Sequence, residues 1–209
     1  MSGRRAKGRA PRPAGGAGPS PIDVTPLPAE FHRRAPIALA RALLGRLLVR
    51  SHAGGRLQIG RIVETEAYLG PHDLAAHSAR GRTSRTEVLF GPAGRAYVYL
   101  VYGLHHCFNV GAGRGAAVLV RALEPIHGIT VRTDGPGRLT AALGIDRALN
   151  GTSLDAGPLW IASGTAVPAT EIERTPRIGV EYAGAWASKP LRFHLRSSPF
   201  VSRAPRRRR

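Results

Sequence analysis

The sequence is short of cysteine and has no long apolar run. Cys107 is the only cysteine in 209 residues, which excludes an internal disulfide bond and suits a reducing compartment. No stretch reaches the roughly 18 consecutive apolar residues of a membrane-spanning helix, and the N-terminal segment lacks the apolar centre of a signal peptide. We therefore expect a cytoplasmic protein that neither crosses a membrane nor is secreted, or a nuclear one if the source is eukaryotic.

Lysine is almost absent among the basic residues. Only Lys7 and Lys189 are lysines, out of 31 lysine and arginine residues. A Schiff base with a carbonyl carbon needs an amine nucleophile, and Lys7 lies in a segment that we expect to be disordered. Chemistry of this kind is therefore restricted to Lys189 and the N-terminal amine.

Acidic residues are scarce as well. The chain has 13 of them against 31 basic ones, which gives a formal net charge of +18. Residues 1–22 and 203–209 each hold five basic residues and no acidic one, and removing these ten charges leaves +8 on the remainder. Solvated arms account for the charge of the two ends but not for the rest. A polyanionic partner is indicated, with nucleic acid as the first candidate.

The composition divides the chain into three parts. Residues 1–27 are rich in proline, glycine and alanine and carry almost no large apolar side chains, so we expect a disordered basic tail. Residues 28–202 are long enough for a single domain with its own core, and residues 203–209 form a second basic tail. No amphipathic surplus suggests self-association, so a monomer is expected.

The apolar pattern predicts few helices and many strands. One helix is expected from Pro36 to Gly45 and another after residues 135–137, on the spacing of their leucines. Runs of β-branched and aromatic residues predict strands at residues 47–49, 57–68, 96–102, 106–110, 117–123, 159–162, 177–180 and 191–195. These elements predict an α+β fold, a single domain on a curved, mostly antiparallel β-sheet, partly open and barrel-like, with peripheral helices and a protruding β-hairpin.

The strand expected at residues 57–68 carries an unusual polar face. Glu64, Glu66 and Tyr68 share that face through the two-residue period of a strand. Taken alone, this pattern favours a solvent-exposed face. Three tyrosines in the 96–102 strand, and Asn109 and Arg121 in the next two, favour a shared polar site instead.

Five ordered segments carry a resemblance to a known family. They read RIVETEAYLGPHDLAAHS (61–78), AYVYLVYG (96–103), VLVRALEP (118–125), GPGRLTAALGI (135–145) and WASKPLRF (186–193). From about Phe31 to Ser202 the chain resembles the alkyladenine (3-methyladenine) DNA glycosylases of the type shared by mammals and many bacteria. Residues 78–95 resemble the bacterial members more closely than the mammalian ones.

The resemblance implies an enzyme of DNA base-excision repair. Such an enzyme flips an alkylated or deaminated purine out of duplex DNA and hydrolyses its N-glycosidic bond with a glutamate-activated water, leaving an abasic site. The implied bases are 3-methyladenine, 7-methylguanine, hypoxanthine and ethenoadenine, in double-stranded DNA at the bacterial nucleoid. No cofactor and no metal are implied.

The resemblance also assigns roles to individual residues. Glu66 corresponds to the general base and Arg121 to the residue that positions the water or the nucleotide backbone. The stacking walls around the extruded base correspond to Tyr68, His77 and Tyr99.

Two further positions have an ordinary structural alternative. Tyr102 corresponds to a hairpin-tip residue that enters the minor groove, and its alternative is packing within a strand. Asn109 corresponds to a pocket residue that excludes the amino group of guanine, and its alternative is a cap on the turn at residues 111–115. Residues 78–95 and 111–115 depart from the mammalian pattern, which leaves the DNA contacts near both loops open.

Several other interpretations are weaker. A metal site is disfavoured because His105 and His106 are strand neighbours that point to opposite faces. The single cysteine excludes an iron–sulfur glycosylase, and the many strands disfavour a helix-hairpin-helix one. Lys189 lies in a matched segment where a structural role fits better, so base removal without strand cleavage is expected. The alternative function, a non-catalytic basic nucleic-acid-binding module, rests on charge alone and leaves Glu66 beside the tyrosines unexplained.

Overall fold

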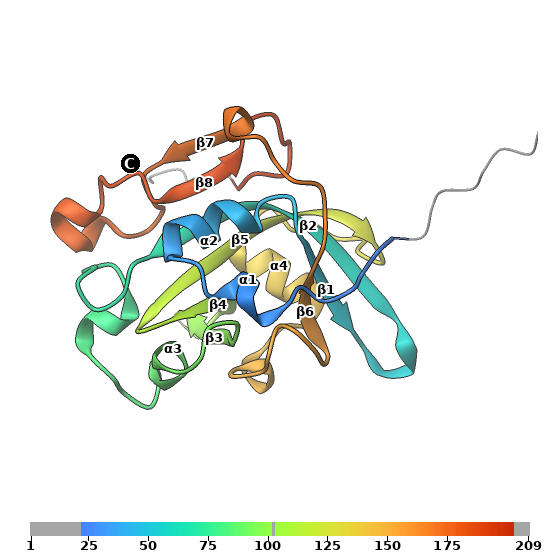
Figure 1. The fold of residues 1–209 in the computed structure, drawn as a ribbon, viewed down its shortest axis with the longest axis horizontal. Helices are drawn as coiled ribbons and strands as arrows, with labels where there is room; N and C mark the ends of the chain where they lie inside the picture. The colour runs from blue at the N-terminus through green and yellow to red at the C-terminus, as the bar shows by residue number, and fades with distance from the viewer. Residues whose placement is uncertain (1–21, 102, 203–209) are drawn as a thin grey trace, which may run out of the picture.

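A computed structural model describes residues 22–101 and 103–202, and its centre is one eight-stranded sheet in which every pair is antiparallel (Figure 1). Six strands follow one path: β3 (Ala96–Val101), β4 (His105–Gly113), β5 (Ala116–His127), β2 (Leu57–Tyr68), β1 (Leu47–Ser51) and β6 (Leu159–Ala162). Two more lie beside this path: β7 (Ile172–Thr175) and β8 (Arg192–Leu195). The expected α+β fold on an antiparallel sheet is confirmed, and the sheet is open rather than closed into a barrel.

The two longest strands, β2 and β5, form the middle of the sheet. The first half of β2 pairs with β1, whereas Glu64, Thr65 and Glu66 pair with β8. The register between β2 and β5 shifts here, because Glu64 faces Ala122 but Thr65 faces Val120, which skips Arg121. Such an irregularity bends a strand and re-aims a side chain. Arg121 lies at this irregularity, and its guanidinium forms an ion pair with each of the two glutamates.

Helices and single helical turns cover the sheet. The α-helices are α1 (Ala29–His32), α2 (Pro36–Leu43), α3 (Glu87–Phe90) and α4 (Pro136–Leu143). The 3₁₀ turns are η1 (Ala53–Gly55), η2 (His77–Arg80), η3 (Arg147–Leu149), η4 (Ala169–Glu171) and η5 (Glu181–Trp186). The two helices expected from the sequence correspond to α2 and α4, and both begin with proline in the first turn.

Gly45 allows the chain to turn sharply between α2 and β1. Its φ is +81°, and an added Cβ would lie 2.1 Å from the carbonyl oxygen of Thr165. Any other residue would therefore suffer both backbone strain and a collision. This turn lays the buried face of α2, with Leu39 and Leu43, on β2 and the core.

The core lies between the sheet and the two longer helices. Its largest fully buried side chains include Phe108 of β4, Phe193 of β8, Leu143 of α4 and Ile62 of β2. Because these residues come from distant parts of the chain, burying them fixes the relative position of the strands that carry the polar site.

The β3–β4 hairpin projects from this core. Val101 pairs with His105 at its end, and Leu104 is 80% exposed while Leu100 is 39% exposed. The hairpin was expected from the sequence. Tyr102, proposed above as its intercalating residue, lies outside the described residues.

The structure differs from the predicted strand at residues 177–180. Strand β7 ends at Thr175, because Pro176 cannot donate to the strand pairing and the Arg177 side chain points inward to form a buried ion pair with Asp73. Residues 24–27, assigned to the N-terminal tail, contact β6: the Trp160 indole donates to the carbonyl of Val24, and the Leu27 amide donates to the carbonyl of Ile161.

Over residues 22–101 and 103–202, no helix is long and apolar enough to cross a membrane.

Candidate active site

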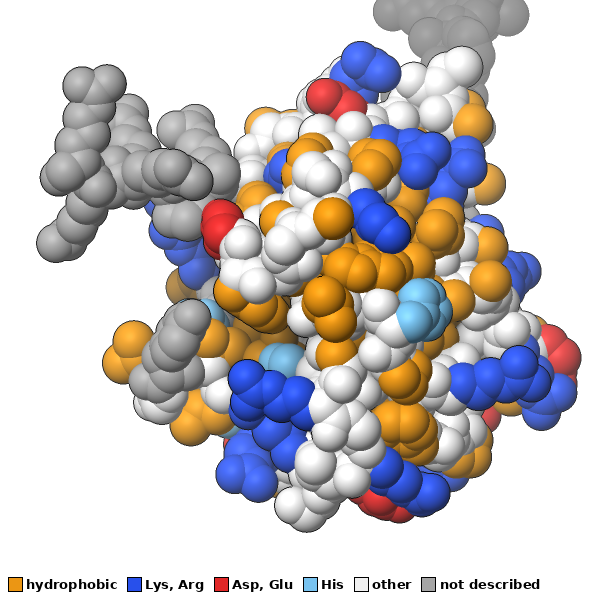
Figure 2. All heavy atoms as spheres, turned by 90° about the vertical axis from the view of Figure 1, so that its left-hand side faces the viewer, with side chains coloured by type: hydrophobic (Ala, Val, Ile, Leu, Met, Phe, Trp, Pro, Cys, Tyr) orange, Lys and Arg blue, Asp and Glu red, His pale blue; other side chains and the backbone are white. Residues whose placement is uncertain are grey.

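A cavity of about 1010 Å³ opens beside the second half of β2. Its walls come from β3, β4 and β5, from the loop before η2, and from the segments before η5 and at the start of α4. On the face drawn in Figure 2, hydrophobic side chains gather in the middle and lysine and arginine side chains lie around them. A polyanion approaching this face would meet positive charge around an apolar centre.

Aromatic rings form one wall of the cavity. The His77 ring lies 4.4 Å from the Tyr99 ring, centroid to centroid, at an interplanar angle of 67°, and Tyr97 lies 5.3 Å from Tyr99. Tyr97 also bonds the Nδ1 atom of His77 through its hydroxyl, at 2.9 Å. Two of the predicted wall residues, His77 and Tyr99, thus stand together with Tyr97, which shares the face of Tyr99 through the strand period.

Burial sets the charge of this wall. The pKa of His77 falls to about 4, chiefly through burial and further through the charges of Arg85 and Arg80. Burial also raises the pKa of Tyr99 and of Tyr68 well above 10. All three rings are therefore uncharged near neutral pH, which suits the stacking of a flat base.

Glu66 lies directly behind the cavity and is fully buried. Its Oε1 atom accepts a hydrogen bond from the Ile178 amide at 2.8 Å and pairs with the Nη1 atom of Arg121 at 3.2 Å. Its Oε2 atom accepts the Tyr68 hydroxyl at 3.0 Å. Ile178, Arg121 and Tyr68 all line the cavity. Each residue that is bonded to Glu66 therefore also faces the cavity. Because the side chain is buried, the alternative of a solvent-exposed polar face is wrong.

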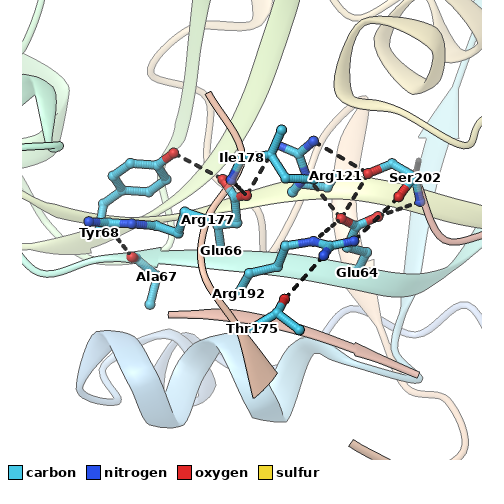
Figure 3. A network of polar contacts seen from close by, with 10 residues as sticks. All are labelled: Glu64, Glu66, Ala67, Tyr68, Arg121, Thr175, Arg177, Ile178, Arg192 and Ser202. Carbon is cyan, nitrogen blue, oxygen red and sulfur yellow. Dashed lines mark hydrogen bonds and ion pairs between the residues drawn. The ribbon is translucent and has the colours of Figure 1, made fainter. Parts of the chain in front are cut away.

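Glu64 lies on the same face of β2 and has a different environment (Figure 3). Its Oε1 atom accepts from the Nε atoms of Arg121, at 3.0 Å, and Arg192, at 2.6 Å, and from the Ser202 hydroxyl at 2.8 Å. Its Oε2 atom accepts from the Ser202 amide at 2.6 Å. Arg121, which is 6% exposed, thus bridges Glu64 and Glu66.

A second buried ion pair supports Tyr68. Arg177 donates two hydrogen bonds to Asp73, at 2.6 and 2.9 Å, and one to the carbonyl of Ala67 at 2.9 Å. Its guanidinium carbon lies 4.6 Å from the centre of the Tyr68 ring. The pair joins the segment after β2 to the segment before η5, and so holds two sides of the cavity together.

Asn109 lies within β4 at the cavity wall and is 3% exposed. Its amide nitrogen donates to the carbonyl of Tyr97 at 3.0 Å, across the strand pair. The side chain thus bonds the neighbouring strand rather than the turn at residues 111–115.

Sequence reasoning missed several members of the site. Asp73 and Arg192 lie in two of the segments that carry the resemblance, which was the available signal for them. Arg177 and Ser202 are revealed by their long-range hydrogen bonds. Tyr97 was noted as a strand neighbour, and its two-residue spacing from Tyr99 was the available signal. Lys189 lies with its Nζ atom 3.4 Å from the centre of the Trp186 ring.

Metal ligation has no evident location. Within the described part of the chain, no three histidine, cysteine, aspartate or glutamate side chains form a group that could hold a metal ion. Burial raises the pKa of the Cys107 thiol to about 11, so the thiol is protonated near neutral pH. The chemistry available at the cavity is that of carboxylates, arginines and aromatic rings.

These features define a class of protein: a basic α+β protein with an aromatic-walled cavity that faces a buried carboxylate–arginine cluster. Residues 30–199 match the methylpurine-DNA glycosylase (MPG) family, and the chain belongs to that family. It is a DNA glycosylase, a hydrolase of base-excision DNA repair, as the sequence resemblance predicted.

Similar proteins come from several microorganisms. A protein of Myxococcus xanthus named "Putative 3-methyladenine DNA glycosylase" is 56% identical over 184 residues, covering 86% of this chain and 94% of its own length. Proteins with the same name are 51% identical in Legionella pneumophila strain Corby, over 85% of this chain and 98% of theirs, and 46% identical in Methanocella arvoryzae, over 86% and 97%.

Proposed function

We propose that the protein excises alkylated and deaminated purines from double-stranded DNA, with Glu66 as the general base. The expected bases are 3-methyladenine, 7-methylguanine, hypoxanthine and ethenoadenine, and the names of the relatives support the first of these. The observation that carries the proposal is the buried carboxylate of Glu66, bonded to three residues that line an aromatic-walled cavity.

The hydrogen-bond count favours Glu66 over Glu64 as the base. A carboxylate offers about four acceptor positions. Among the described residues, four donors hold Glu64, two of them arginine nitrogens, whereas three hold Glu66, one of them an arginine nitrogen. All three partners of Glu66 line the cavity, whereas Arg192 beside Glu64 does not, which supports Glu66 as the carboxylate that meets the attacking water.

The proposed reaction is a hydrolysis at the sugar carbon C1′. The oxygen of water forms a bond to C1′, the bond from C1′ to the purine nitrogen breaks, and one proton of the water passes to Glu66. The bonding electrons leave with the base. Arg121 lines the cavity beside Glu66, where it orients the water or the nucleotide backbone.

The cavity requires the base to leave the DNA helix before it can react. Extrusion of a nucleotide costs a few kcal/mol, and least for a damaged or mispaired base. Stacking on aromatic side chains contributes about 1–3 kcal/mol per base, and Tyr68, His77 and Tyr99 supply the rings. Since the two contributions are of similar size, weak pairing of a lesion in its duplex is enough to favour its capture.

The proposed product is an intact strand with an abasic site. A lyase step would need an amine, and among the described residues the single lysine, Lys189, is seated on the Trp186 ring. A monomer acting at the bacterial nucleoid completes the proposal, and the microbial relatives support that location.

Replacement of Glu66 tests the assignment. We expect Glu66→Gln to lower single-turnover excision of hypoxanthine from a duplex by about 10²–10⁴-fold, with binding to the damaged duplex within a few fold of wild type. The matched control is Glu124→Gln, because Glu124 pairs with Arg61 on the same two strands outside the cluster. Product should appear only after alkaline cleavage of the strand.

The outcomes separate the two candidate functions. Near-normal excision by Glu66→Gln would remove the general-base assignment. Absence of excision by the wild type on all four lesions, with DNA binding retained, would favour the non-catalytic binding module, which charge alone supports. Strand cleavage without alkali would contradict base removal as the sole activity.

A further inference from the structure

Glu64 is as buried as Glu66 but has more donors around it among the described residues, and two of them are arginine nitrogens. Four donors occupy its two oxygens, and they come from β5, β8 and the segment that ends at Ser202 (Figure 3). A buried ionised carboxylate is costly unless it is paired and hydrogen-bonded. Its retention two residues from Glu66 calls for a role other than proton transfer.

We propose that Glu64 and Arg192 are positioning residues of the base-excision reaction, which together aim Arg121 and set the basicity of Glu66. The inference rests on the proposed role of Glu66. Neither Glu64 nor Arg192 lines the cavity. They act on Glu66 through Arg121 and through their charges.

The aim of Arg121 follows from three contacts. Its Nε atom donates to Glu64 at 3.0 Å and its Nη2 atom donates to the Ser202 hydroxyl at 3.3 Å. With these two nitrogens held on one side, the planar guanidinium must direct Nη1 toward Glu66, 3.2 Å away. The register shift that skips Arg121 on β5 provides the backbone position for this orientation.

The charges around Glu66 balance one another. Glu64, Glu66, Arg121 and Arg192 form a cluster with no net charge, and Arg177 beside it is neutralised by Asp73. The other titratable groups that interact with Glu66 are Tyr68 on its own strand, Tyr99 on β3 and Cys107 on β4. All three are neutral near pH 7, because burial raises the pKa of each.

Opposite substitutions should therefore change the proton affinity of Glu66 in opposite directions. Removing the negative charge of Glu64 leaves two arginines near one carboxylate, which stabilises ionised Glu66 and makes it a weaker base. Removing the positive charge of Arg192 leaves an excess of negative charge, which favours protonated Glu66.

The experiment measures the single-turnover rate of hypoxanthine excision between about pH 4.5 and 9 for Glu64→Gln, Arg192→Gln and the double variant. The acidic limb of the profile, which reports protonation of the base, should move to lower pH in Glu64→Gln and to higher pH in Arg192→Gln, by about one pH unit each. The double variant, neutral again, should return the limb toward the wild-type position. The plateau rate of Glu64→Gln should fall at least about tenfold, because Glu64 no longer holds the Arg121 guanidinium in its orientation toward Glu66.

Two further variants separate positioning from simple structural support. Ser202→Ala removes one hydrogen bond to Glu64 and one to Arg121 but no charge, so its rate should fall a few fold with the limb unmoved. Glu124→Gln removes a carboxylate from the Arg61 pair elsewhere on these strands and should leave both the rate and the limb unchanged. If Glu64→Gln does not fold, the inference is still tested, because the limb should move to higher pH in Arg192→Gln and stay in place in Ser202→Ala.

An acidic limb that stays in place in Arg192→Gln, or that moves in the same direction in both single variants, would overturn the inference. Glu66→Gln distinguishes this failure from failure of the proposed function. If Glu66→Gln is inactive while the limb does not respond to Glu64 and Arg192, then only the positioning role is wrong. If Glu66→Gln is active, the base assignment itself is wrong.

Discussion

Replacement of Asp73 by asparagine should destabilise the protein more than any single surface change, because it leaves a buried arginine without its counter-ion. Asp73 and Arg177 are both fully buried, and they share two hydrogen bonds. Asp73 also accepts from the amides of Leu69 and Ala75, at 3.0 and 3.1 Å. An asparagine keeps one acceptor oxygen but turns an NH₂ group toward donors that it cannot satisfy.

The size of the effect follows from these contacts. Breaking a buried ion pair by removing one partner costs about 3–5 kcal/mol. For a domain of this length a change of 1 kcal/mol shifts Tm by roughly 2–4 °C, so we expect a fall of roughly 6–20 °C. Arg177→Met should cost less. It leaves the buried Asp73 carboxylate without its counter-ion, but this group keeps the amide hydrogen bonds of Leu69 and Ala75 and can be neutralised by a proton, and methionine fills part of the volume over the Tyr68 ring.

The assay is urea denaturation of the two single variants and of the double variant Asp73→Asn/Arg177→Met, followed by circular dichroism. The double variant should recover part of the loss of Asp73→Asn, because neither charge remains unpaired. A loss of unfolding free energy below about 1 kcal/mol in Asp73→Asn would refute the reasoning. So would a double variant whose loss of unfolding free energy exceeds the sum of the two single losses.

The pH dependence of stability provides an independent check on Asp73. Burial alone would raise the pKa of its carboxyl group, but the hydrogen bonds from Arg177 and from the Leu69 amide outweigh burial and hold the pKa below 3.8. The unfolded state therefore binds a proton more readily than the folded state. The stability that Asp73 contributes is fully present above about pH 4 and is lost as the pH falls through the folded pKa. Asp73→Asn should remove that part of the acid dependence.

Two other predictions concern the cavity wall. Asn109→Ser should raise excision of guanine from a guanine–thymine mispair relative to hypoxanthine opposite thymine. The smaller side chain no longer collides with the two-position amino group of guanine. An unchanged ratio in a folded, active variant would leave Asn109 only its hydrogen bond to the carbonyl of Tyr97. His77, with a folded pKa of about 4 against 6.5 in an unfolded chain, should lower stability as the pH falls from 6.5 to 4, by up to about 1.4 kcal/mol per pH unit. Chemical denaturation of wild type and His77→Gln across this range measures the difference, and an identical slope in both would contradict a neutral, buried His77.

Much of the fold was accessible from local pattern. Leucine spacing after a proline predicted α2 and α4, and β-branched and aromatic runs predicted β2 and β6 with the bounds that the structure has. Strand β7 was missed, and residues 177–180, predicted instead, have apolar residues at strand spacing but pair with no strand. Arg177 in this segment is drawn into an ion pair with Asp73, 104 positions earlier in the chain, and local periodicity carries no signal of such a contact.

The sequence by itself determined which side chains share a face. The two-residue period of a strand placed Glu64, Glu66 and Tyr68 together, and Tyr97 with Tyr99, whatever the rest of the chain does. It could not decide whether the two glutamates were exposed, because burial depends on what covers the strand. Only the tertiary structure did so, by bringing β8 and Ser202 from the far end of the chain onto β2.

The tertiary structure also decided the chemical difference between the two glutamates. They are equivalent in the strand pattern, yet one is held by two arginines and Ser202 while the other is bonded to residues of the cavity wall. The difference comes from Arg192 and Ser202, which donate to Glu64, whereas Arg121, at the register shift on β5, forms an ion pair with both glutamates. A shift of this kind reflects how two strands meet over their whole length, so no short segment of sequence encodes it.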